Sequence, residues 1–259
     1  MRLYKYRELN NFGLRLLSNG ELYFSSPDKL NDPLDCGFYP AAVRAAVERV
    51  AGEGLHEKLV EVLSRQVDDK ITGDTTSILE AVENRVKKAG VLSFSLTATE
   101  PLLWSHYADG HAGICVGIDK AWFDDFIERE WEPKKLIGGA QVSYKKQPDF
   151  HDVVAQYVKR DASGKEIITD HMFVDIVMPV LRTKSEHWYY EQEYRIIRRE
   201  PGVVSLPGEA IKEVVVGNRI SEGDYALVQA VLSKPSLSHV RVGRAEFAEN
   251  SFLMDIQYV

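Results

Sequence analysis

The sequence predicts an α+β protein with a mixed, mainly antiparallel sheet, flanking helices and a helical insertion at about residues 40–90. Apolar and polar residues alternate through Val91–Leu96, as in a strand buried on one face. Apolar residues recur at helical spacing from Thr75 or Thr76 to Lys88. Strand and helix patterns do not alternate strictly along the chain, so a doubly wound parallel sheet fits less well than an α+β fold.

The first elements are a strand, a helix and a second strand. Leu3–Tyr6 predicts the first strand, and Asn10 or Asn11 can cap a helix that ends before Gly20. Leu22–Ser25 predicts the second strand. The segment from Ser26 to Pro33 has turn chemistry, with room for at most one helical turn between its two prolines.

The insertion is predicted to be helical and to cover the sheet. Ala41–Val50 and Leu55–Val67 are two predicted helices, and a third ends at Lys88 before Gly90. No internal repeat or linker separates it from the rest, so we expect residues 1–259 to form a single domain.

The second half alternates short strands with helices. Thr99 is predicted to cap a helix that has Pro101 in its first turn and ends by Gly110. Helices are also predicted at Ala121–Ile127, at Asp170–Leu181 with Pro179 ending or kinking it, and from Ser221 to Leu232. Strands are predicted at Gly113–Ile118, Ala140–Tyr144, Gln192–Ile197 and Lys212–Val216, and extended segments at Val240–Val242 and Ala245–Tyr258.

Composition excludes several functional classes. The net charge of −7 argues against nucleic-acid binding through a broad basic surface, although a local phosphate pocket remains compatible with it. The two cysteines, Cys36 and Cys115, lack metal-site spacing and suit a reducing compartment. Neither a signal-peptide core nor a membrane-length apolar run is present, so we expect a cytoplasmic protein without membrane contact.

Familiar catalytic motifs are missing. The sequence lacks the phosphate-binding loop, the dinucleotide-binding glycine motif, the nucleophile elbow and the paired-histidine zinc motif. A P-loop NTPase, a Rossmann dehydrogenase and an α/β-hydrolase are therefore disfavoured.

The segment Trp104–His111 concentrates polar and aromatic side chains. On a helix, His106 and Tyr107 share a face with Leu103, and Trp104 lies on its flank. An imidazole beside aromatic rings suits a flat ligand with polar edges, such as a nucleobase or nicotinamide. The alternative is an amphipathic helix in which Ser105 and the histidines are only hydrogen-bonded. His106 and His111 lack helical spacing and a third ligand, so we expect no metal site.

A second candidate group lies in Trp188–Arg195. On a strand, Glu191, Glu193 and Arg195 would share one face. Adjacent carboxylates raise each other's pKa unless a cation or a ligand hydroxyl compensates, which suits a catalytic base or a ribose-binding carboxylate. A solvated strand face with a Glu–Arg pair is the structural alternative.

The N-terminal region offers weaker candidates. Lys5 and Arg7 on the first strand could bind a phosphate, or could simply be a solvated strand end. Asn31 and Asp32 can lock a turn through side chain-to-backbone hydrogen bonds, which favours a structural role.

Four blocks together resemble the bacterial domain-of-unknown-function family 2971 and span about residues 3–200. They are Leu22–Pro27 with Asn31–Pro33, Leu92–Ser95, Trp104–Ala108 and Tyr190–Arg195. The family carries no settled activity, so this resemblance implies a grouping and no particular reaction.

A second resemblance is to ADP-ribosyltransferase-like domains. Phe94-Ser95, Tyr107-Ala108 and a Glu-x-Glu pair occur here in the order found there. The resemblance implies that Glu193 holds the nicotinamide ribose, Glu191 orients the acceptor and Tyr107 stacks on nicotinamide. Lys5 or Arg7 replaces the first-strand His or Arg, and the Trp-Ser-His block lies outside the usual pattern.

These patterns lead to three hypotheses. The first is an NAD-using ADP-ribosyltransferase-like enzyme, with NAD as substrate and an unidentified protein or nucleic-acid acceptor. The catalytic candidates are Glu193, Glu191 and His106; the ligand-binding candidates are Lys5, Arg7, Ser95, Trp104, Ser105, Tyr107, His111 and Arg195. The second is a non-catalytic nucleotide sensor in stress or phage defence, binding through Trp104, His106, Tyr107 and Arg195. The third is a metal-dependent nuclease or phosphodiesterase using His106, His111 and carboxylates.

Overall fold

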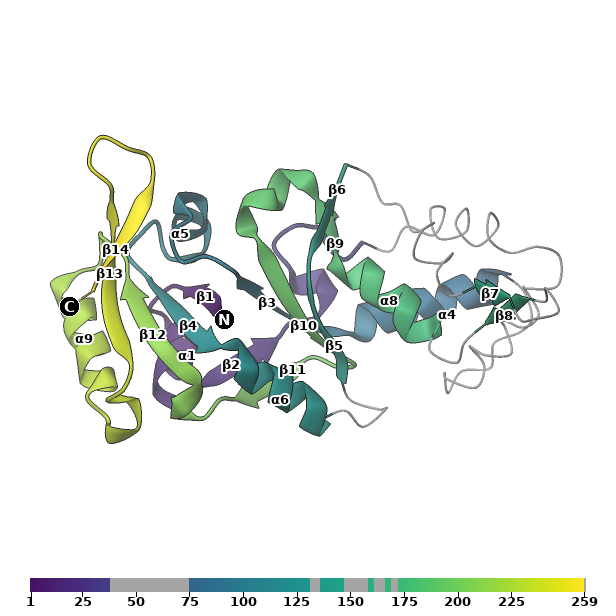
Figure 1. Ribbon diagram of the computed structural model, residues 1–259, viewed down its shortest axis with the longest axis horizontal. Helices are drawn as coiled ribbons and strands as arrows, with labels where there is room; N and C mark the ends of the chain where they lie inside the picture. The colour runs from purple at the N-terminus through teal and green to yellow at the C-terminus, as the bar shows by residue number, and fades with distance from the viewer. Residues whose placement is uncertain (38–74, 131–135, 147–157, 161–165, 169–171, 259) are drawn as a thin grey trace.

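An eight-stranded sheet forms the centre of the computed structural model, which describes residues 1–37, 75–130, 136–146, 158–160, 166–168 and 172–258 (Figure 1). Its order is β14-β13-β12-β4-β1-β3-β10-β5. The strands are β1 (Arg2–Arg7), β3 (Gly90–Ser95), β4 (Ile114–Asp119), β5 (Leu136–Gln141), β10 (Glu193–Arg198), β12 (Ile211–Val216), β13 (Arg241–Phe247) and β14 (Met254–Tyr258). Every neighbouring pair in this sheet is antiparallel except β12 and β13, so the predicted mixed, mainly antiparallel α+β fold is confirmed.

Three short strand pairs flank the sheet. They are β2 (Glu21–Phe24) with β11 (Gly202–Ser205), β6 (Ser143–Lys145) with β9 (Thr183–Ser185), and β7 (Val158–Arg160) with β8 (Glu166–Ile168). The single strand predicted at Ala140–Tyr144 is wrong. The chain leaves the edge of β10 after Gln141 and then pairs with β9, which divides this segment into two strands.

The described helices are α1 (Asn11–Asn19), α4 (Thr75–Lys88), α5 (Pro101–Tyr107), α6 (Lys120–Glu130), α8 (Met172–Arg182) and α9 (Glu222–Leu232), with short 3₁₀ turns η1 (Pro27–Lys29), η2 (Glu186–Glu191), η3 (Gly208–Ala210) and η4 (Pro235–Leu237). Three of these helices, α1, α5 and α9, begin at a side chain that accepts a hydrogen bond from the first turn. Asn10 caps α1, and Gly20 ends it with φ 67°. Ser221 caps α9 as predicted.

The cap of α5 differs from the prediction. The Glu100 carboxylate accepts a hydrogen bond from the amide of Leu102, which makes Glu100 the capping residue. Thr99 instead shares a hydrogen bond with the hydroxyl of Thr97, so its side chain is turned toward the preceding loop.

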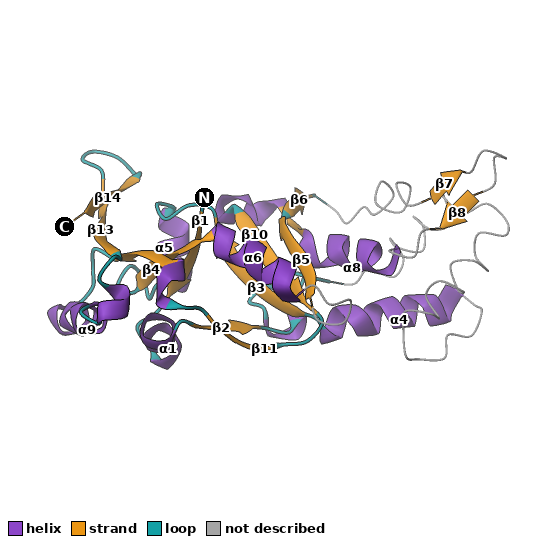
Figure 2. Cartoon of the chain, turned by 60° about the horizontal axis from the view of Figure 1, so that its bottom comes forward, coloured by secondary structure: helices purple, strands orange, loops and turns teal. Residues whose placement is uncertain are grey.

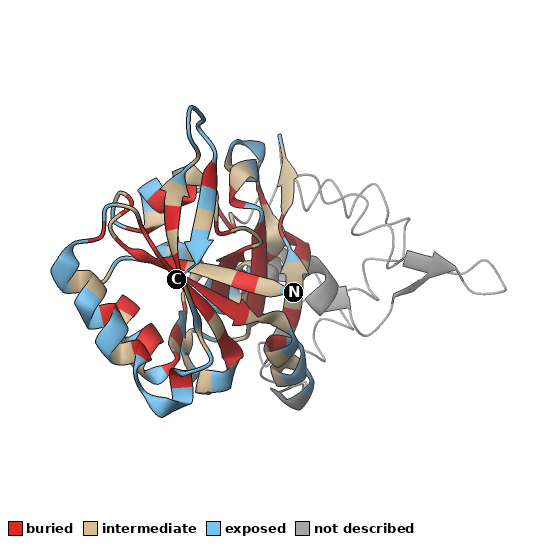
Figure 3. Cartoon of the chain, turned by 60° about the vertical axis from the view of Figure 1, so that its left-hand side comes forward, coloured by how far each residue is buried: buried red, intermediate tan, exposed pale blue. Residues whose placement is uncertain are grey.

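Helices cover both faces of the sheet (Figures 2 and 3). On one face, Leu16 of α1, Phe123 of α6 and Val228 of α9 are fully buried in the main core. On the other face, Trp104 of α5 packs edge-on against Tyr6 of β1 at 5.2 Å between ring centroids. The two faces of β1 therefore have different neighbours, because successive side chains of a strand point to opposite sides.

The helical insertion is described only in its last part. The helix predicted to end at Lys88 is confirmed as α4, which packs against α8 beyond the end of the sheet (Figure 1). The helices predicted at Ala41–Val50 and Leu55–Val67 lie outside the described residues. In α8 the helix continues past Pro179 to Arg182. Within the described ranges, no helix is both long enough and apolar enough to cross a membrane.

Candidate functional site

A cavity of about 220 Å³ lies where β1 and β3 separate. The two strands share a single paired position, Tyr4 with Ser95. At the other end of β3, Val91 exchanges two backbone hydrogen bonds with Ser25, at 2.9 and 2.7 Å, and so pairs with the chain after β2. Between these two points the ammonium of Lys5 reaches across and donates to the carbonyl of Ser93 at 2.6 Å.

The cavity is walled by segments that are distant in sequence. Its lining includes β1, β3, the chain from Tyr23 to Asp35, two residues of α5, and single residues of β9, η2 and β10. Polar and charged side chains in this wall are Lys5, Arg7, Ser25, Lys29, Asn31, Asp35, Ser93, Ser95, Tyr107, Lys184, Glu191 and Glu193. Such convergence of polar groups in a concave site is the usual arrangement of a ligand pocket.

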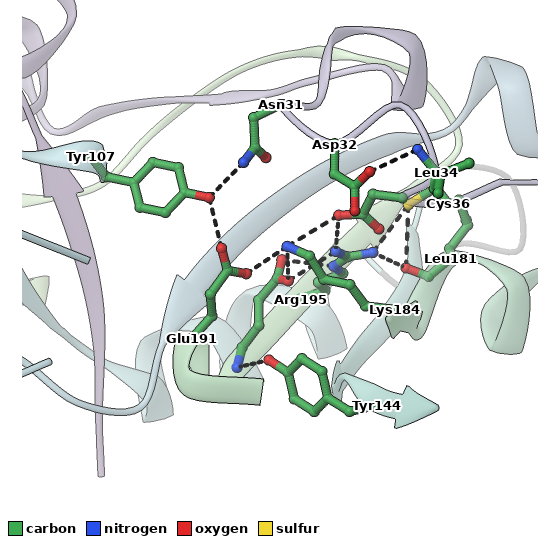
Figure 4. Close-up of polar contacts among 12 residues, drawn as sticks. Asn31, Asp32, Leu34, Cys36, Tyr107, Tyr144, Leu181, Lys184, Glu191 and Arg195 are labelled. Carbon is green, nitrogen blue, oxygen red and sulfur yellow. Dashed lines mark hydrogen bonds and ion pairs between the residues drawn. The ribbon is translucent and has the colours of Figure 1, made fainter. Parts of the chain in front are cut away.

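A buried charge cluster forms one side of this cavity (Figure 4). It consists of Asp35, Lys184, Glu191, Glu193 and Arg195, each no more than 5% exposed. The cluster holds three carboxylates and two cations. Its formal charge is therefore −1 when all five groups are ionised.

Arg195 lies at the centre of the charge cluster. Its Nε and Nη2 donate to the two carboxylate oxygens of Glu193 at 2.7 and 2.8 Å. Nη2 also donates to Asp35 at 2.6 Å, and Nη1 donates to the carbonyl of Leu181 at 2.7 Å. A guanidinium held on all sides in this way is a structural residue, because its donors are all occupied by the protein.

Lys184 joins the second glutamate to the charge cluster. Its ammonium donates to Glu191 at 2.5 Å and lies 3.3 Å from oxygens of both Glu193 and Asp35. The other oxygen of Glu191 accepts a 2.7 Å hydrogen bond from the hydroxyl of Tyr107. That hydroxyl accepts in turn from the side-chain amide of Asn31 at 2.7 Å, so one side of Glu191 is linked through the half-buried Tyr107 to the exposed Asn31 (Figure 4).

The two glutamates have opposite pKa shifts. For Glu191, burial is the largest effect and raises the carboxyl pKa, and the neighbouring Glu193 adds to it against the attraction of Lys184. For Glu193, burial also opposes ionisation, but Arg195 and Lys184 together lower the pKa from 4.5 to about 2. Two close carboxylates whose environments separate their pKa values are typical of acid–base sites.

The two glutamates belong to different elements of secondary structure. Glu191 ends η2, whereas Glu193 begins β10. Gln192 between them adopts the left-handed conformation, with φ 43° and ψ 53°. The strand predicted at Gln192–Ile197 therefore begins one residue later, at Glu193, and Glu191 does not share a strand face with Glu193 and Arg195. The amide of Glu193 is fixed separately, by donating to the hydroxyl of Tyr144 at 2.8 Å.

Two basic side chains of β1, Lys5 and Arg7, line the cavity. The described part of the chain places no carboxylate within ion-pair distance of either of them. Burial lowers the pKa of Arg7, and the charge of Glu8 opposes this shift. Burial and then Arg7 lower the pKa of the Lys5 ammonium well below its ordinary value, and Glu193 and Glu191 oppose this shift.

Six of the eleven residues selected from the sequence line the cavity. They are Lys5, Arg7, Ser95, Tyr107, Glu191 and Glu193. Trp104 and Arg195 are fully buried, and the Trp104 indole donates to the carbonyl of Ala98 at 2.9 Å. Both side chains are thus part of the core beside the cavity and present no surface to a ligand.

The remaining three candidates lie outside the cavity wall. Ser105 and His111 bond to each other, with 3.0 Å between the hydroxyl and Nε2. The His111 ring also packs on Phe247 of β13, and burial lowers its pKa. His106 is exposed, and its ring lies 6.1 to 6.4 Å from those of Tyr107, Trp188 and Tyr190.

Sequence reasoning missed Lys184 and Asp35. Lys184 occurs in Thr183-Lys184-Ser185, which carries no motif, and Asp35 lies in a turn-rich segment. Burial of either residue depends on strands and turns that meet only in the folded chain. The Glu-x-Glu pair was the better signal for a further cation. Two adjacent carboxylates need more balancing positive charge than Arg195 alone supplies.

The described residues contain no group of three or more His, Cys, Asp or Glu side chains arranged to hold a metal ion. His106 lies beside Tyr107, Trp188 and Tyr190, whereas His111 contacts Ser105 and Phe247. The hypothesis of a metal-dependent nuclease therefore has no ligand group within the described ranges.

The fold and site together define an α+β protein with a pocket between diverging strands, lined by cations on one strand and carboxylates opposite. Residues 103–196 match the family described as "Protein of unknown function (DUF2971)", so the resemblance is confirmed over this segment. The match includes the Trp104–Ala108 and Tyr190–Arg195 blocks. No curated protein and no solved structure matches the chain.

Proposed function

We propose that the cavity is the active site of an enzyme that binds NAD and transfers or releases its ADP-ribose part. One observation carries this proposal: a single cavity contains both an Arg7 guanidinium without a carboxylate partner in the described chain and a glutamate pair with separated pKa values. Such a combination suits a ligand with an anionic part and a bond that breaks by proton transfer or charge separation.

Arg7 and Lys29 are the groups proposed to bind the diphosphate. Both line the cavity, and Lys29 is exposed at its rim on η1. Guanidinium and ammonium groups bind phosphate oxygens through charge-assisted hydrogen bonds. Tyr23 lines the same cavity, is 39% exposed, and offers ring surface to a flat group such as nicotinamide.

Glu191 is proposed as the catalytic carboxylate, in place of Glu193. Both oxygens of Glu193 are held by Arg195, whereas those of Glu191 are held by Lys184 and by the Tyr107 hydroxyl, and both of these residues line the cavity. With its raised pKa, Glu191 can accept a proton from the attacking hydroxyl or water. The ionised Glu193 beside it favours the positive charge that develops on the ribose as the bond to nicotinamide breaks.

The size of the cavity restricts how NAD would fit. Pockets for drug-sized ligands commonly measure about 300–1,000 Å³, and this cavity of about 220 Å³ is smaller. It suits the nicotinamide ribose, while the adenosine half would lie across the rim beside Lys29.

The test is nicotinamide release from NAD, measured by liquid chromatography. Glu191→Gln is expected to lower the rate by about 10²–10⁴-fold, the usual contribution of a general base. Glu186→Gln is the matched control, because Glu186 is an exposed carboxylate on the same turn η2. Absence of release by the parent protein, or an unchanged rate in Glu191→Gln, would contradict the proposal.

A second candidate is a nucleotide-binding module without catalysis. The carboxylate oxygens of Glu191 and Glu193 already accept hydrogen bonds from Tyr107, Lys184 and Arg195. This favours the second candidate, because carboxylates held by the protein can serve a structural role beside a bound nucleotide. A role in stress or phage defence would belong to this reading. Calorimetry with a nucleotide panel separates the two functions: binding without turnover supports the module, and turnover supports the enzyme.

A further inference from the structure

We propose that Lys5 is a nucleophilic amine, and that the cavity can bind an aldehyde or ketone bearing a phosphate or carboxylate group and hold it as an imine on Lys5. This reactivity goes beyond the proposed use of NAD and does not depend on it. It rests on the position of Lys5 in the gap between β1 and β3.

The surroundings of Lys5 differ from those of Lys184 in the same cavity. The Lys184 ammonium contacts three carboxylates and is held as a cation, with its pKa raised despite burial. The Lys5 ammonium donates instead to the neutral carbonyl of Ser93 and lies 5.7 Å from the centre of the Phe94 ring. One pocket thus contains a lysine whose positive charge is balanced by carboxylates and a lysine without a carboxylate partner in the described chain.

The charges around Lys5 favour its neutral form. Burial has the largest effect on its pKa, and Arg7, two residues along the same strand, acts in the same direction. Glu193 on β10 and Glu191 on η2 oppose the shift, but the net change is a marked lowering. A lysine that is desolvated beside a second cation is a recognised kind of amine nucleophile.

The same cavity supplies the other groups that the reaction needs. Arg7 can bind the anionic group of the carbonyl compound, because the described chain leaves it without a carboxylate partner. Glu191 and the Tyr107 hydroxyl lie in the same wall and are joined by a 2.7 Å hydrogen bond. This pair can exchange protons with the reacting oxygen.

The proposed step is a condensation. The neutral amine of Lys5 attacks the carbonyl carbon, the carbon–oxygen π pair moves to oxygen, and one proton passes from the nitrogen to that oxygen to give a neutral carbinolamine. The nitrogen lone pair then forms the C=N bond as the hydroxyl leaves as water with a proton from the protonated Glu191. The remaining N–H proton passes back to the Glu191 carboxylate, which leaves the neutral imine. One carbonyl compound and one amine give one imine and one water, without any change in oxidation state.

The experiment uses pyridoxal 5′-phosphate, an aldehyde with a phosphate, on the folded full chain at pH 7. Cyanoborohydride reduces any imine, and peptide mapping by mass spectrometry gives the labelling rate of each lysine. An ordinary lysine with a pKa of about 10.4 is neutral in roughly one molecule in 2,500 at pH 7, and each unit of lowering increases that fraction about tenfold. Lys5 is therefore expected to react at least about tenfold faster than Lys87 and Lys88, which are exposed and lie outside the cavity wall.

Variants separate the amine from the phosphate site. Lys5→Arg keeps a basic side chain but removes the nucleophilic amine, and it should remove the fast-labelled peptide without creating another. Arg7→Gln should slow labelling of Lys5 by pyridoxal 5′-phosphate more than labelling by unphosphorylated pyridoxal, because only the phosphorylated aldehyde loses an ion pair with Arg7. Labelling of Lys5 in the parent chain no faster than that of Lys87 and Lys88 would overturn the proposal, whatever the protein does with NAD.

Discussion

Two buried carboxylate networks lie on the same sheet, and they differ in how their charge is balanced. Glu213 on β12 is fully buried and accepts from Arg2 and Tyr4 at 2.9 Å and from Tyr258 at 2.8 Å. One carboxylate is thus matched by one cation and two hydroxyls. The charge cluster of Asp35, Lys184, Glu191, Glu193 and Arg195 instead holds three carboxylates against two cations and borders a cavity.

The two networks differ in whether the glutamate of a tyrosine–glutamate hydrogen bond borders the cavity. Burial, and then Glu213, raise the pKa of Tyr4 to about 12, so the hydroxyl stays a hydrogen-bond donor. In the charge cluster the same kind of tyrosine–glutamate bond, from Tyr107 to Glu191, lies at the cavity wall. Glu191 lines the cavity, whereas Glu213 is fully buried and is not among the lining residues.

Removing Arg195 should have the largest effect on stability. Arg195→Met leaves Asp35 and Glu193 buried without their main partner, and breaking a buried ion pair in this way costs about 3–5 kcal/mol. Urea unfolding followed by circular dichroism measures the loss. Arg15→Met is the control, because its ion pair with Glu21 involves an Arg15 side chain that is 51% exposed and should contribute less than about 1 kcal/mol. Equal losses in the two variants would show that the charge cluster is not a structural unit.

The two glutamates should respond in opposite ways to pH. Glu193 has a lowered pKa, so its contribution to stability is present above about pH 4.5 and is lost as the pH falls toward about 2. Glu191 has a raised pKa, so its ionisation destabilises the fold as the pH rises above 4.5. We expect Glu193→Gln to flatten the acid side of a plot of unfolding free energy against pH, and Glu191→Gln to reduce the decline above pH 4.5. Identical profiles for both variants would contradict the separation of their pKa values.

A matched pair of tyrosines gives the smallest expected effect. Tyr258→Phe and Tyr107→Phe each remove one hydroxyl that donates to a buried glutamate, at 2.8 and 2.7 Å. Each should cost about 0.5–1.5 kcal/mol of unfolding free energy. Under the proposed function only Tyr107→Phe should also slow nicotinamide release, so an equal effect of both variants on release would remove the functional distinction between the networks.

The sequence allowed local structure to be predicted where a local signal determines it. Asn10 and Gly20 mark the two ends of α1 because capping and left-handed backbone depend on single residues. The division of Ala140–Tyr144 into two strands was not predictable, because it depends on β9, some forty residues away. The prediction of Thr99 as a cap failed because a neighbouring glutamate competed for the same amides.

The candidate site was predictable only in part for a similar reason. Residues that combine charge with a marked pattern, such as Glu191, Glu193 and Lys5, can be selected by their chemistry. The aromatic and imidazole groups of Trp104–His111 gave the same kind of signal, yet Trp104 is fully buried and His106 lies outside the cavity wall. Which polar residues share a cavity depends on where β1 and β3 separate, and that separation is a property of the tertiary structure.

The left-handed backbone at Gln192 has a consequence for how this site can change in evolution. It places Glu191 on the short turn η2 and Glu193 on the sheet. The position of Glu191 therefore depends on the conformation of a turn, whereas the position of Glu193 depends on strand pairing. Substitutions in η2 can reshape the ligand-facing side while the ladder that holds Glu193 and Arg195 is preserved. A short turn at the cavity wall thus lies directly beside the sheet framework, separated from it by a single residue.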